Sequence, residues 1–399
     1  MSIDWRSKGF WSPEEVLDPE RIAAERPSIF GGGFTWPLLV VRRAGVEANI
    51  ATMAAFCERH GFDFAPHAKT SMAPGLIQAQ LRAGAWGMTV ATANQALILR
   101  RLGVERVLIA NEILDPVALR WLAAERAAGW EVYFQVDSVA GVRAAAAAGG
   151  PLSVLAELGH PGGRTGVRTL DELETVARAV EAAPGVELAG VTAYEGQLPD
   201  QYAVDEFLDR LVEGFELLAK EGLLPEQPIL SAGGSAWFDR VAERLEGFGR
   251  RARLILRSGA SVTHDDGFYR EHTPFVRVPD QGGLTAALEV WAQVLSAPEP
   301  GLALVGMGKR DVPFDEGLPE PQEIRDASGS VRPAAGLRVT RLNDHHTYLE
   351  SGPGGGTGLE PGDLIRFGIS HPCTAFDKWR DIPVVDEERR VVEVLHTYL

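Results

Sequence analysis

The chain has 399 residues, of which 45% are hydrophobic and 24% are charged, and this composition is typical of a folded globular protein. Its 39 basic and 55 acidic side chains give a net charge of −16, which argues against a nucleic-acid-binding protein. No apolar run reaches the roughly 18 residues that span a membrane, and the first residues lack the apolar region of a signal peptide. Two cysteines, Cys57 and Cys373, cannot form a disulfide framework. We therefore expect a cytoplasmic enzyme.

Short β-rich runs alternate with helical stretches eight times in the first two thirds of the chain. The expected strands are Phe62–Lys69, Gly87–Ala91, Val107–Glu112, Glu131–Asp137, Leu152–Leu158, Leu188–Tyr194, Ile229–Gly233 and Leu254–Gly259. The expected helices between them include Pro74–Ala83, Asn94–Leu102, Pro116–Ala128, Ser138–Ala148, Asp171–Ala183 and Asp205–Glu221. This alternation predicts parallel βαβ units. Eight such units favour a closed (β/α)₈ TIM-type barrel, with an open doubly wound sheet as the alternative.

After Asp280 the pattern changes to strands separated by Pro- and Gly-rich turns. The expected strands are Leu284–Ser296, Leu302–Met307, Leu337–Leu342, Asp363–Ile369 and Val391–Tyr398. A further strand, Trp36–Arg42, precedes the first barrel helix and is a candidate to pair with this all-β part. The sequence therefore predicts an N-terminal segment (1–42) that contributes a strand to the β-domain, an α/β barrel (43–275) and a C-terminal all-β domain (276–399).

A lysine stands at the end of the first expected barrel strand, in the run Pro66-His67-Ala68-Lys69-Thr70-Ser71. In a parallel barrel, side chains at the C-terminal strand ends face the mouth where active sites form. Burial there would lower the pKa of an amine and make it nucleophilic, so Lys69 is a candidate to form a Schiff base. On these six residues alone, a lysine in a surface loop is the alternative.

Glycine-bearing loops follow the seventh and eighth expected strands. They are Ser231–Ser235 and Arg257–Ser261. Loops at these two places in a barrel often bind phosphate, because glycines let backbone N–H groups approach the anion. The residues that would contact it are Gly233, Gly234, Ser235, Gly259 and Ala260. Together with a strand-end lysine, the loops describe a site for pyridoxal 5′-phosphate (PLP).

The run His67-Ala68-Lys69-Thr70 resembles the PLP-lysine motif of fold-type III enzymes, in the branch of D-serine dehydratase and D-threonine aldolase. The resemblance covers most of the chain and continues through Glu157, Gly163-Arg164-Thr165-Gly166, Ala193-Tyr194-Glu195-Gly196 and both glycine loops. It implies an alanine-racemase-like fold, with a PLP-binding barrel and a C-terminal β-domain, and usually a homodimer.

The resemblance also implies roles for individual residues. Lys69 would carry the cofactor as a Schiff base, with His67 beside it, and Arg164 would lie near the phenolic oxygen of PLP. Either Tyr194 or Thr192 would face the pyridine ring, because alternation along the strand puts both side chains on one side.

The run His371-Pro372-Cys373 follows an expected strand. In an extended chain, residues two apart project to the same side, so the imidazole and the thiolate can share one metal ion such as Zn²⁺. On these three residues alone, a structural loop with a buried cysteine is the alternative. The resemblance favours the metal, because D-serine dehydratase-like proteins carry His-x-Cys here and some aldolase relatives carry His-x-Asp. Asn343-Asp344-His345-His346 resembles a Glu-His pair beside that metal, with His346 as the candidate and His345 as the alternative.

The resemblance implies a lyase that needs PLP and a divalent metal, Zn²⁺ or Mn²⁺, and takes a small D-amino acid. We expect β-elimination from a D-3-hydroxyamino acid, which yields a keto acid and ammonia. The first alternative is retro-aldol cleavage to glycine and an aldehyde, which needs the same metal. A racemase would not need the metal pair. The alternative of another class is a PLP carrier without catalysis, although such barrels usually lack a second domain.

Overall fold

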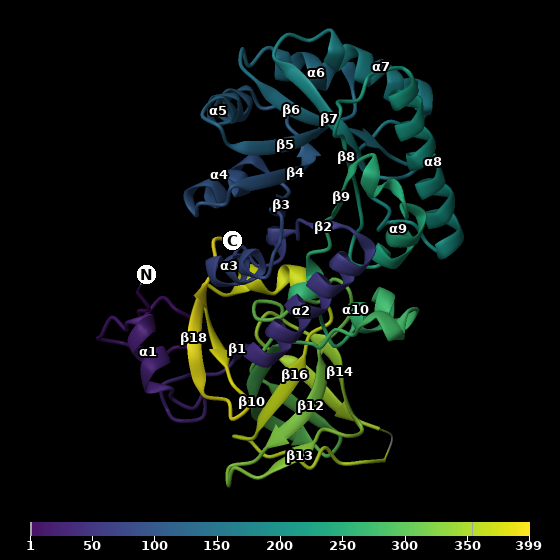
Figure 1. Ribbon diagram of the computed structural model, residues 1–399. Helices are drawn as coiled ribbons and strands as arrows, with labels where there is room; N and C mark the ends of the chain where they lie inside the picture. The colour runs from purple at the N-terminus through teal and green to yellow at the C-terminus, as the bar shows by residue number, and fades with distance from the viewer. Residues whose placement is uncertain (1, 353) are drawn as a thin grey trace.

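The computed structural model describes residues 2–352 and 354–399, and these residues form two lobes (Figure 1). The upper lobe in that view contains parallel strands surrounded by helices, and the lower lobe contains mainly antiparallel strands. Helix α2 (Arg43–His60) connects the two lobes. Among the described residues, no helix combines the length and the apolar character needed to cross a membrane.

Eight parallel strands form the first lobe, in the order β2-β9-β8-β7-β6-β5-β4-β3. Their bounds are β2 Asp63–Phe64, β3 Met88–Val90, β4 Arg106–Glu112, β5 Glu131–Val136, β6 Leu152–Leu158, β7 Val186–Ala193, β8 Ile229–Ala232 and β9 Arg253–Leu256. The two ends of this order, β2 and β3, meet through a parallel bridge between His67 and Thr89. The N–H group of Thr89 also donates to the carbonyl of Pro66 at 2.9 Å. The sheet thus closes, and the predicted barrel is confirmed.

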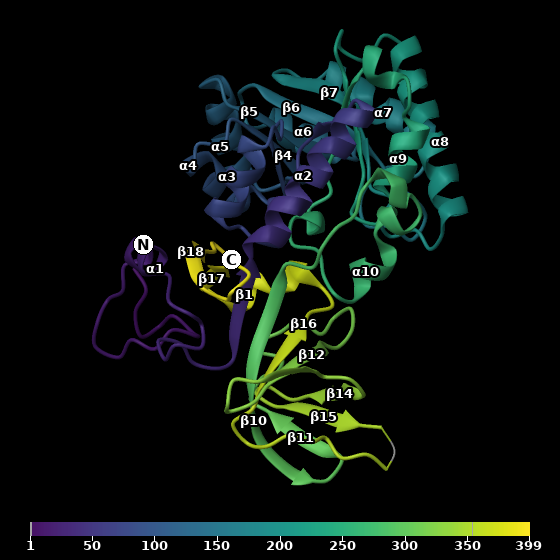
Figure 2. The same cartoon turned by 60° about the horizontal axis from the view of Figure 1, so that its bottom comes forward.

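The barrel helices alternate with the strands and cover their outer side (Figure 2). Their bounds are α3 Pro74–Arg82, α4 Ala93–Arg101, α5 Pro116–Ala127, α6 Val139–Ala146, α7 Leu170–Glu181, α8 Gln201–Lys220 and α9 Phe238–Arg244. Polar caps begin several of them, and Thr169 and Glu172 form a capping box at α7. The apolar faces of these helices pack on the strands in one large core. A smaller apolar layer fills the barrel interior and includes Leu108, Leu155 and Ile255.

The second lobe is a ten-stranded sheet with the order β13-β12-β16-β10-β1-β17-β18, from which β11, β15 and β14 extend beyond β10. Its strands are β1 Leu38–Arg42, β10 Leu288–Glu299, β11 Leu302–Val305, β12 Glu320–Arg325, β13 Val331–Pro333, β14 Leu337–Leu342, β15 Thr347–Ser351, β16 Leu364–Gly368, β17 Asp381–Val385 and β18 Val391–His396. The confirmed all-β domain thus includes β1, which pairs antiparallel with β10 and parallel with β17. A short helix, α1 (Pro19–Glu25), lies beside β18.

The two lobes meet at the mouth of the barrel. After β2, the chain forms a short 3₁₀ helix, η1 (Ala68–Thr70), and after β16 it forms another, η6 (Pro372–Thr374). These two helices pack against each other. The segment after β9 is hydrogen-bonded to the end of β16, since the N–H group of Asp266 donates to the carbonyl of Ile369 at 2.9 Å. It then forms helix α10 (Phe268–His272). The residues predicted to carry chemistry therefore come from both lobes to one place.

Candidate active site

A cavity opens at the C-terminal ends of the barrel strands. Among the residues predicted to bind the cofactor, it is lined by His67, Lys69, Arg164, Tyr194, Gly233 and Gly234. Lining residues that were not predicted as site residues include Asn111, Gln135, Glu157, Thr165 and Arg257. The cavity is therefore polar and contains three basic side chains, those of Lys69, Arg164 and Arg257, as a site for an anionic cofactor requires.

Lys69 lies in η1, directly after the first barrel strand. Its backbone N–H group donates to Nδ1 of His67 at 3.4 Å, which fixes the start of this short helix. Burial lowers the pKa of the Lys69 amine, and the nearby Arg164 guanidinium acts in the same direction, whereas Cys373 opposes it. Burial also holds the pKa of His67 well below its usual value, and the Lys69 cation lowers it further. The site thus contains a neutral imidazole beside an amine that gives up its proton more easily than a surface lysine.

The structure distinguishes between the two candidates, Thr192 in strand β7 and Tyr194, which follows the end of that strand. The Thr192 hydroxyl is fully buried, donates to the carbonyl of Ser231 at 3.0 Å and accepts from Arg257 at 3.0 Å. Tyr194 instead lines the cavity, and the Arg164 guanidinium lies over its ring at 4.4 Å from the centroid. Tyr194 is therefore the residue positioned to contact a flat aromatic ligand.

The glycine loop after β8 is held by a buried carboxylate. The N–H groups of Gly233 and Gly234 donate to the two carboxylate oxygens of Glu195, at 3.1 and 2.6 Å. Gly233 cannot be replaced by a residue with a side chain, because its φ is +96° and a Cβ atom would lie 2.2 Å from Leu256. Both glycines line the cavity, but their N–H groups already have a partner, so they shape the loop rather than offer free donors to an anion.

The second loop, after β9, joins the first through serine hydroxyls. The Ser235 hydroxyl accepts from the N–H group of Ala260 at 3.2 Å and from the Ser258 hydroxyl at 3.1 Å. Gly259 needs its lack of a side chain too, because a Cβ atom would lie 2.5 Å from the carbonyl oxygen of His67. The two predicted phosphate loops are therefore adjacent, and they lie beside the segment that carries the lysine.

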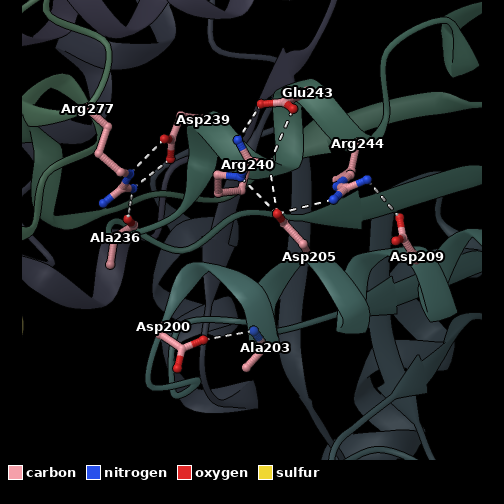
Figure 3. Close-up of polar contacts among 10 residues, drawn as sticks. All are labelled: Asp200, Ala203, Asp205, Asp209, Ala236, Asp239, Arg240, Glu243, Arg244 and Arg277. Atoms are coloured by element: carbon pink, nitrogen blue, oxygen red, sulfur yellow. Dashed lines mark hydrogen bonds and ion pairs between the residues drawn. The ribbon is translucent and has the colours of Figure 1, made fainter.

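Ion pairs support the loop after β8 from outside the barrel (Figure 3). Ala236 follows this loop in the chain, and Arg277 donates to its carbonyl at 2.5 Å. Arg277 also donates to the carboxylate of Asp239 at 2.7 and 2.8 Å. Asp239 belongs to α9, and the same helix is tied to α8 by two bonds of 2.9 Å from Arg240 to Asp205. The loop is thus fixed between the barrel and its outer helices.

A buried arginine that was not predicted as a site residue forms part of the cavity wall. Arg257 donates to the Thr192 hydroxyl at 3.0 Å, to the Ser231 hydroxyl at 2.5 Å and to the carbonyl of Ala193 at 2.7 Å. Burial lowers its pKa and the carboxyl groups of Glu195 and Glu157 oppose this shift. An arginine remains charged under these conditions, so it supplies a fixed positive charge within the barrel.

The predicted metal pair lies next to the lysine segment. The hydroxyl of Thr70, the residue after Lys69, is 3.5 Å from Sγ of Cys373. Nδ1 of His371 lies 2.7 Å from a carboxylate oxygen of Asp315. Burial lowers the pKa of His371, but Cys373 and Asp315 outweigh burial and raise it to about 9. Asp315 thus orients the ring as a carboxylate does behind a metal-binding histidine, and leaves the other ring nitrogen on the side of the thiol.

The donor set of His371 and Cys373 suits Zn²⁺, which accepts imidazole and thiolate. Within residues 2–352 and 354–399, no group of three or more His, Cys, Asp or Glu side chains is arranged to hold a metal. A metal on this pair would therefore keep positions for water or substrate. His346 is exposed in the turn between β14 and β15, and among the described residues it does not form a metal-holding group with the pair. Its alternative, His345, is exposed in the same turn and lies 3.9 Å from Asp311.

Comparison with known proteins agrees with this two-lobed arrangement. Residues 41–246 match the model of the alanine racemase N-terminal domain, and residues 287–385 match the model of a putative serine dehydratase domain. The chain is 28% identical over 298 residues to the 3-hydroxy-D-aspartate aldolase of Paracoccus denitrificans (strain Pd 1222), covering 71% of this chain and 74% of that protein. It is 27% identical over 366 residues to the D-threo-3-hydroxyaspartate dehydratase of Delftia sp. (strain HT23), covering 84% and 90%. The crystal structure of D-threonine aldolase from Filomicrobium marinum has the same fold, with a TM-score of 0.78, 24% identity and coverage of 92% and 95%.

Proposed function

The chain belongs to the family of the alanine racemase N-terminal domain, and on this premise we propose that it is a PLP- and metal-dependent dehydratase of D-3-hydroxyamino acids. In the proposed reaction the Cα proton and the β-hydroxyl group leave the substrate, and hydrolysis of the product gives a keto acid and ammonia. We further propose Zn²⁺ or Mn²⁺ as the metal and a cytoplasmic homodimer as the working form, in line with the resemblance to fold-type III enzymes.

One observation carries this proposal: the contact between the lysine segment of the first lobe and the His-x-Cys pair of the second. Lys69 lines the cavity, and the hydroxyl of the next residue, Thr70, lies 3.5 Å from Sγ of Cys373, which supports a site that combines the amine with the proposed metal pair. Relatives named as aldolases and as a dehydratase of 3-hydroxyaspartate support a lyase for D-3-hydroxyamino acids. The match of residues 287–385 to a putative serine dehydratase domain favours elimination, since this range includes His371 and Cys373.

The residues of the chain have distinct tasks in this reaction. When bound, PLP would supply an electron sink for the negative charge that develops at Cα. Lys69 is the base that takes the Cα proton, because burial lowers the pKa of its amine. His371 and Cys373 would hold the divalent metal, which would supply Lewis acidity at the β-hydroxyl. Tyr194 and Arg164 bind and orient the ring, since they stack on each other at the cavity wall.

The experiment that tests the proposal separates loss of the proton from loss of the hydroxyl. The purified protein with PLP is incubated in D₂O with D-serine, D-threonine or 3-hydroxy-D-aspartate, before and after chelation of metal. We expect deuterium at Cα in both preparations, since proton removal depends on Lys69. Release of keto acid and ammonia should collapse after chelation and return with Zn²⁺ or Mn²⁺, because hydroxide is a poor leaving group. Lys69→Ala should abolish both reactions.

Other results would favour other functions. Glycine and an aldehyde as the metal-dependent products would establish retro-aldol cleavage, which the relative named 3-hydroxy-D-aspartate aldolase makes the second candidate. A protein that binds PLP but neither exchanges deuterium nor changes its absorption spectrum with any D-amino acid would be a carrier. Full dehydratase activity in a preparation free of metal by elemental analysis would leave His371 and Cys373 as structural residues.

A further inference from the structure

Glu157 is a buried carboxyl group with one oxygen that has no partner. It lies in strand β6, is 5% exposed and lines the cavity beside Thr165 and Arg257. Its Oε2 atom is buried and has no hydrogen-bond partner among the described residues. An unpaired buried carboxyl oxygen is costly, and such groups in proteins are normally satisfied by a protein group, water or ligand. Because this oxygen belongs to a cavity-lining residue, a ligand of the cavity can supply its partner.

The position of Glu157 in the barrel indicates which part of a ligand it would meet. Strand β6 is four strands away from β2 in both directions around the barrel, so Glu157 faces the lysine segment from the opposite side. The two glycine loops predicted to hold the phosphate follow β8 and β9, on a third side. In PLP the ring nitrogen is para to the aldehyde carbon, and the ring hydroxyl is on the ring edge opposite the phosphate arm. With the aldehyde at Lys69 and the phosphate at the two glycine loops, these two polar atoms would be left for residues on other sides of the cavity. Glu157 is a polar group on one of these sides.

We propose that Glu157 is a further cofactor-binding residue, whose free Oε2 atom forms a hydrogen bond with a polar atom of the PLP ring, either the ring nitrogen or the ring hydroxyl oxygen. This inference rests on the proposed function, because it requires PLP in the cavity. The unprotonated ring nitrogen and the ionised ring oxygen both accept hydrogen bonds, and in the proposed bond Glu157 is the donor. Burial raises the pKa of its carboxyl group, although Thr165 and Arg257 oppose this shift, and the protonated form is a donor.

The test compares cofactor affinity with the stability of the cofactor-free protein. The variants are Glu157→Met, which removes both polar oxygens, and Glu157→Gln, which keeps a donor of similar size. Ser153→Ala is the matched control, because Ser153 lies four residues earlier on the same face of β6 and is also buried. Its hydroxyl accepts from Arg126 at 3.1 Å, and it does not line the cavity. PLP affinity is measured by quenching of tryptophan fluorescence, and stability by urea unfolding.

We expect Glu157→Met to weaken PLP binding about tenfold or more, and Glu157→Gln to stay within about threefold of the parent. Ser153→Ala should bind PLP like the parent. The cofactor-free Met variant should be at least as stable as the parent, because an unpaired buried group has been replaced by an apolar one. This combination separates a bond to the cofactor from a structural role, which would lower stability instead.

The two possible acceptors are distinguished with 3-deoxypyridoxal phosphate, which lacks the ring hydroxyl. If Glu157→Met does not weaken binding of this analogue, the hydroxyl oxygen is the acceptor. If the substitution still weakens binding, the ring nitrogen is the acceptor. Equal PLP affinity of the parent and the Met variant would overturn the inference while leaving the proposed function intact. Failure of the parent to bind PLP would overturn both.

If the Met variant does not fold, Glu157→Gln decides alone. A carboxyl donor loses its proton as the pH rises, whereas an amide does not. In the parent protein, this loss should lower the PLP affinity as the pH rises. The Gln variant should not show this decrease. An identical pH profile in both proteins would overturn the inference.

Discussion

Glu195 offers the sharpest test of how the cofactor loop is built. Its side chain is completely buried, and its two carboxylate oxygens accept the N–H groups of Gly233 and Gly234 at 3.1 and 2.6 Å. Glu195→Gln keeps the shape but provides only one acceptor oxygen, so one buried N–H group loses its partner and faces an NH₂ group. An unsatisfied buried donor costs about 1–3 kcal/mol, and a bond to a charged group contributes about 1.5–3 kcal/mol. We therefore expect the free energy of unfolding to fall by about 2–3 kcal/mol.

The matched control is Glu172→Gln at the start of helix α7. Glu172 also accepts two backbone N–H groups, from Arg168 at 2.8 Å and Thr169 at 3.0 Å, but these contacts are exposed to solvent. Both groups donate to the same oxygen, Oε2, which the amide oxygen of glutamine can replace, so this variant should cost less than about 1 kcal/mol. Urea unfolding of both variants gives the comparison, and PLP titration should show weaker binding only for Glu195→Gln. Equal destabilisation by the two substitutions, or unchanged PLP affinity in Glu195→Gln, would refute the reasoning.

Three further outcomes are expected. Gly234→Val should weaken PLP binding about tenfold in a fluorescence titration, because the added Cβ would lie 2.9 Å from the Tyr194 ring, which must shift in the cavity. Burial lowers the pKa of His264 to about 4, and the unfolded side chain titrates near 6.5. Stability should therefore decrease as the pH falls from about 6.5 to about 4, and His264→Gln should weaken this decrease in urea unfolding. Burial raises the pKa of the Cys57 thiol to about 12, so iodoacetamide at neutral pH should label Cys373 but not Cys57, and added Zn²⁺ should protect Cys373, as measured by peptide mass spectrometry.

The barrel was predictable because its local signals agree with its tertiary structure. Strand β6 has the predicted bounds, Leu152–Leu158, since a fully buried parallel strand is an almost continuous apolar run. In the second lobe the prediction missed β12, β13, β15 and the fully buried β17. Strand β13 (Val331–Pro333) is fully exposed, and β12 (Glu320–Arg325) is rich in polar residues, so only pairing with neighbouring strands defines them. The first barrel strand is shorter than predicted, because the chain turns into η1 before Lys69.

The site shows the same division between local and long-range information. Lys69 and the His371–Cys373 pair could be predicted because each belongs to a short run with a chemical signature. Glu195 and Asp315 were not predicted as contributors, because the partners of Glu195 are 38 and 39 residues away in the sequence and the histidine partner of Asp315 is 56 residues away. A carboxylate that accepts two amide groups, or one that orients a histidine, has no local pattern. Only the folded chain shows these contacts.

The connection between the lobes explains why the two kinds of chemistry meet. Strand β1 lies between β10 and β17 in the second lobe, and the chain then runs through α2 directly into the barrel strand that precedes Lys69. The His371–Cys373 pair lies between β16, which pairs with β10, and β17, which pairs with β1. The lysine and the pair are therefore both positioned by the strands around β1. A barrel that only carried PLP would have no need for this arrangement, whereas a lyase that removes a proton and a hydroxyl from neighbouring carbons requires both groups at a fixed distance. The fold thus favours catalysis over cofactor transport.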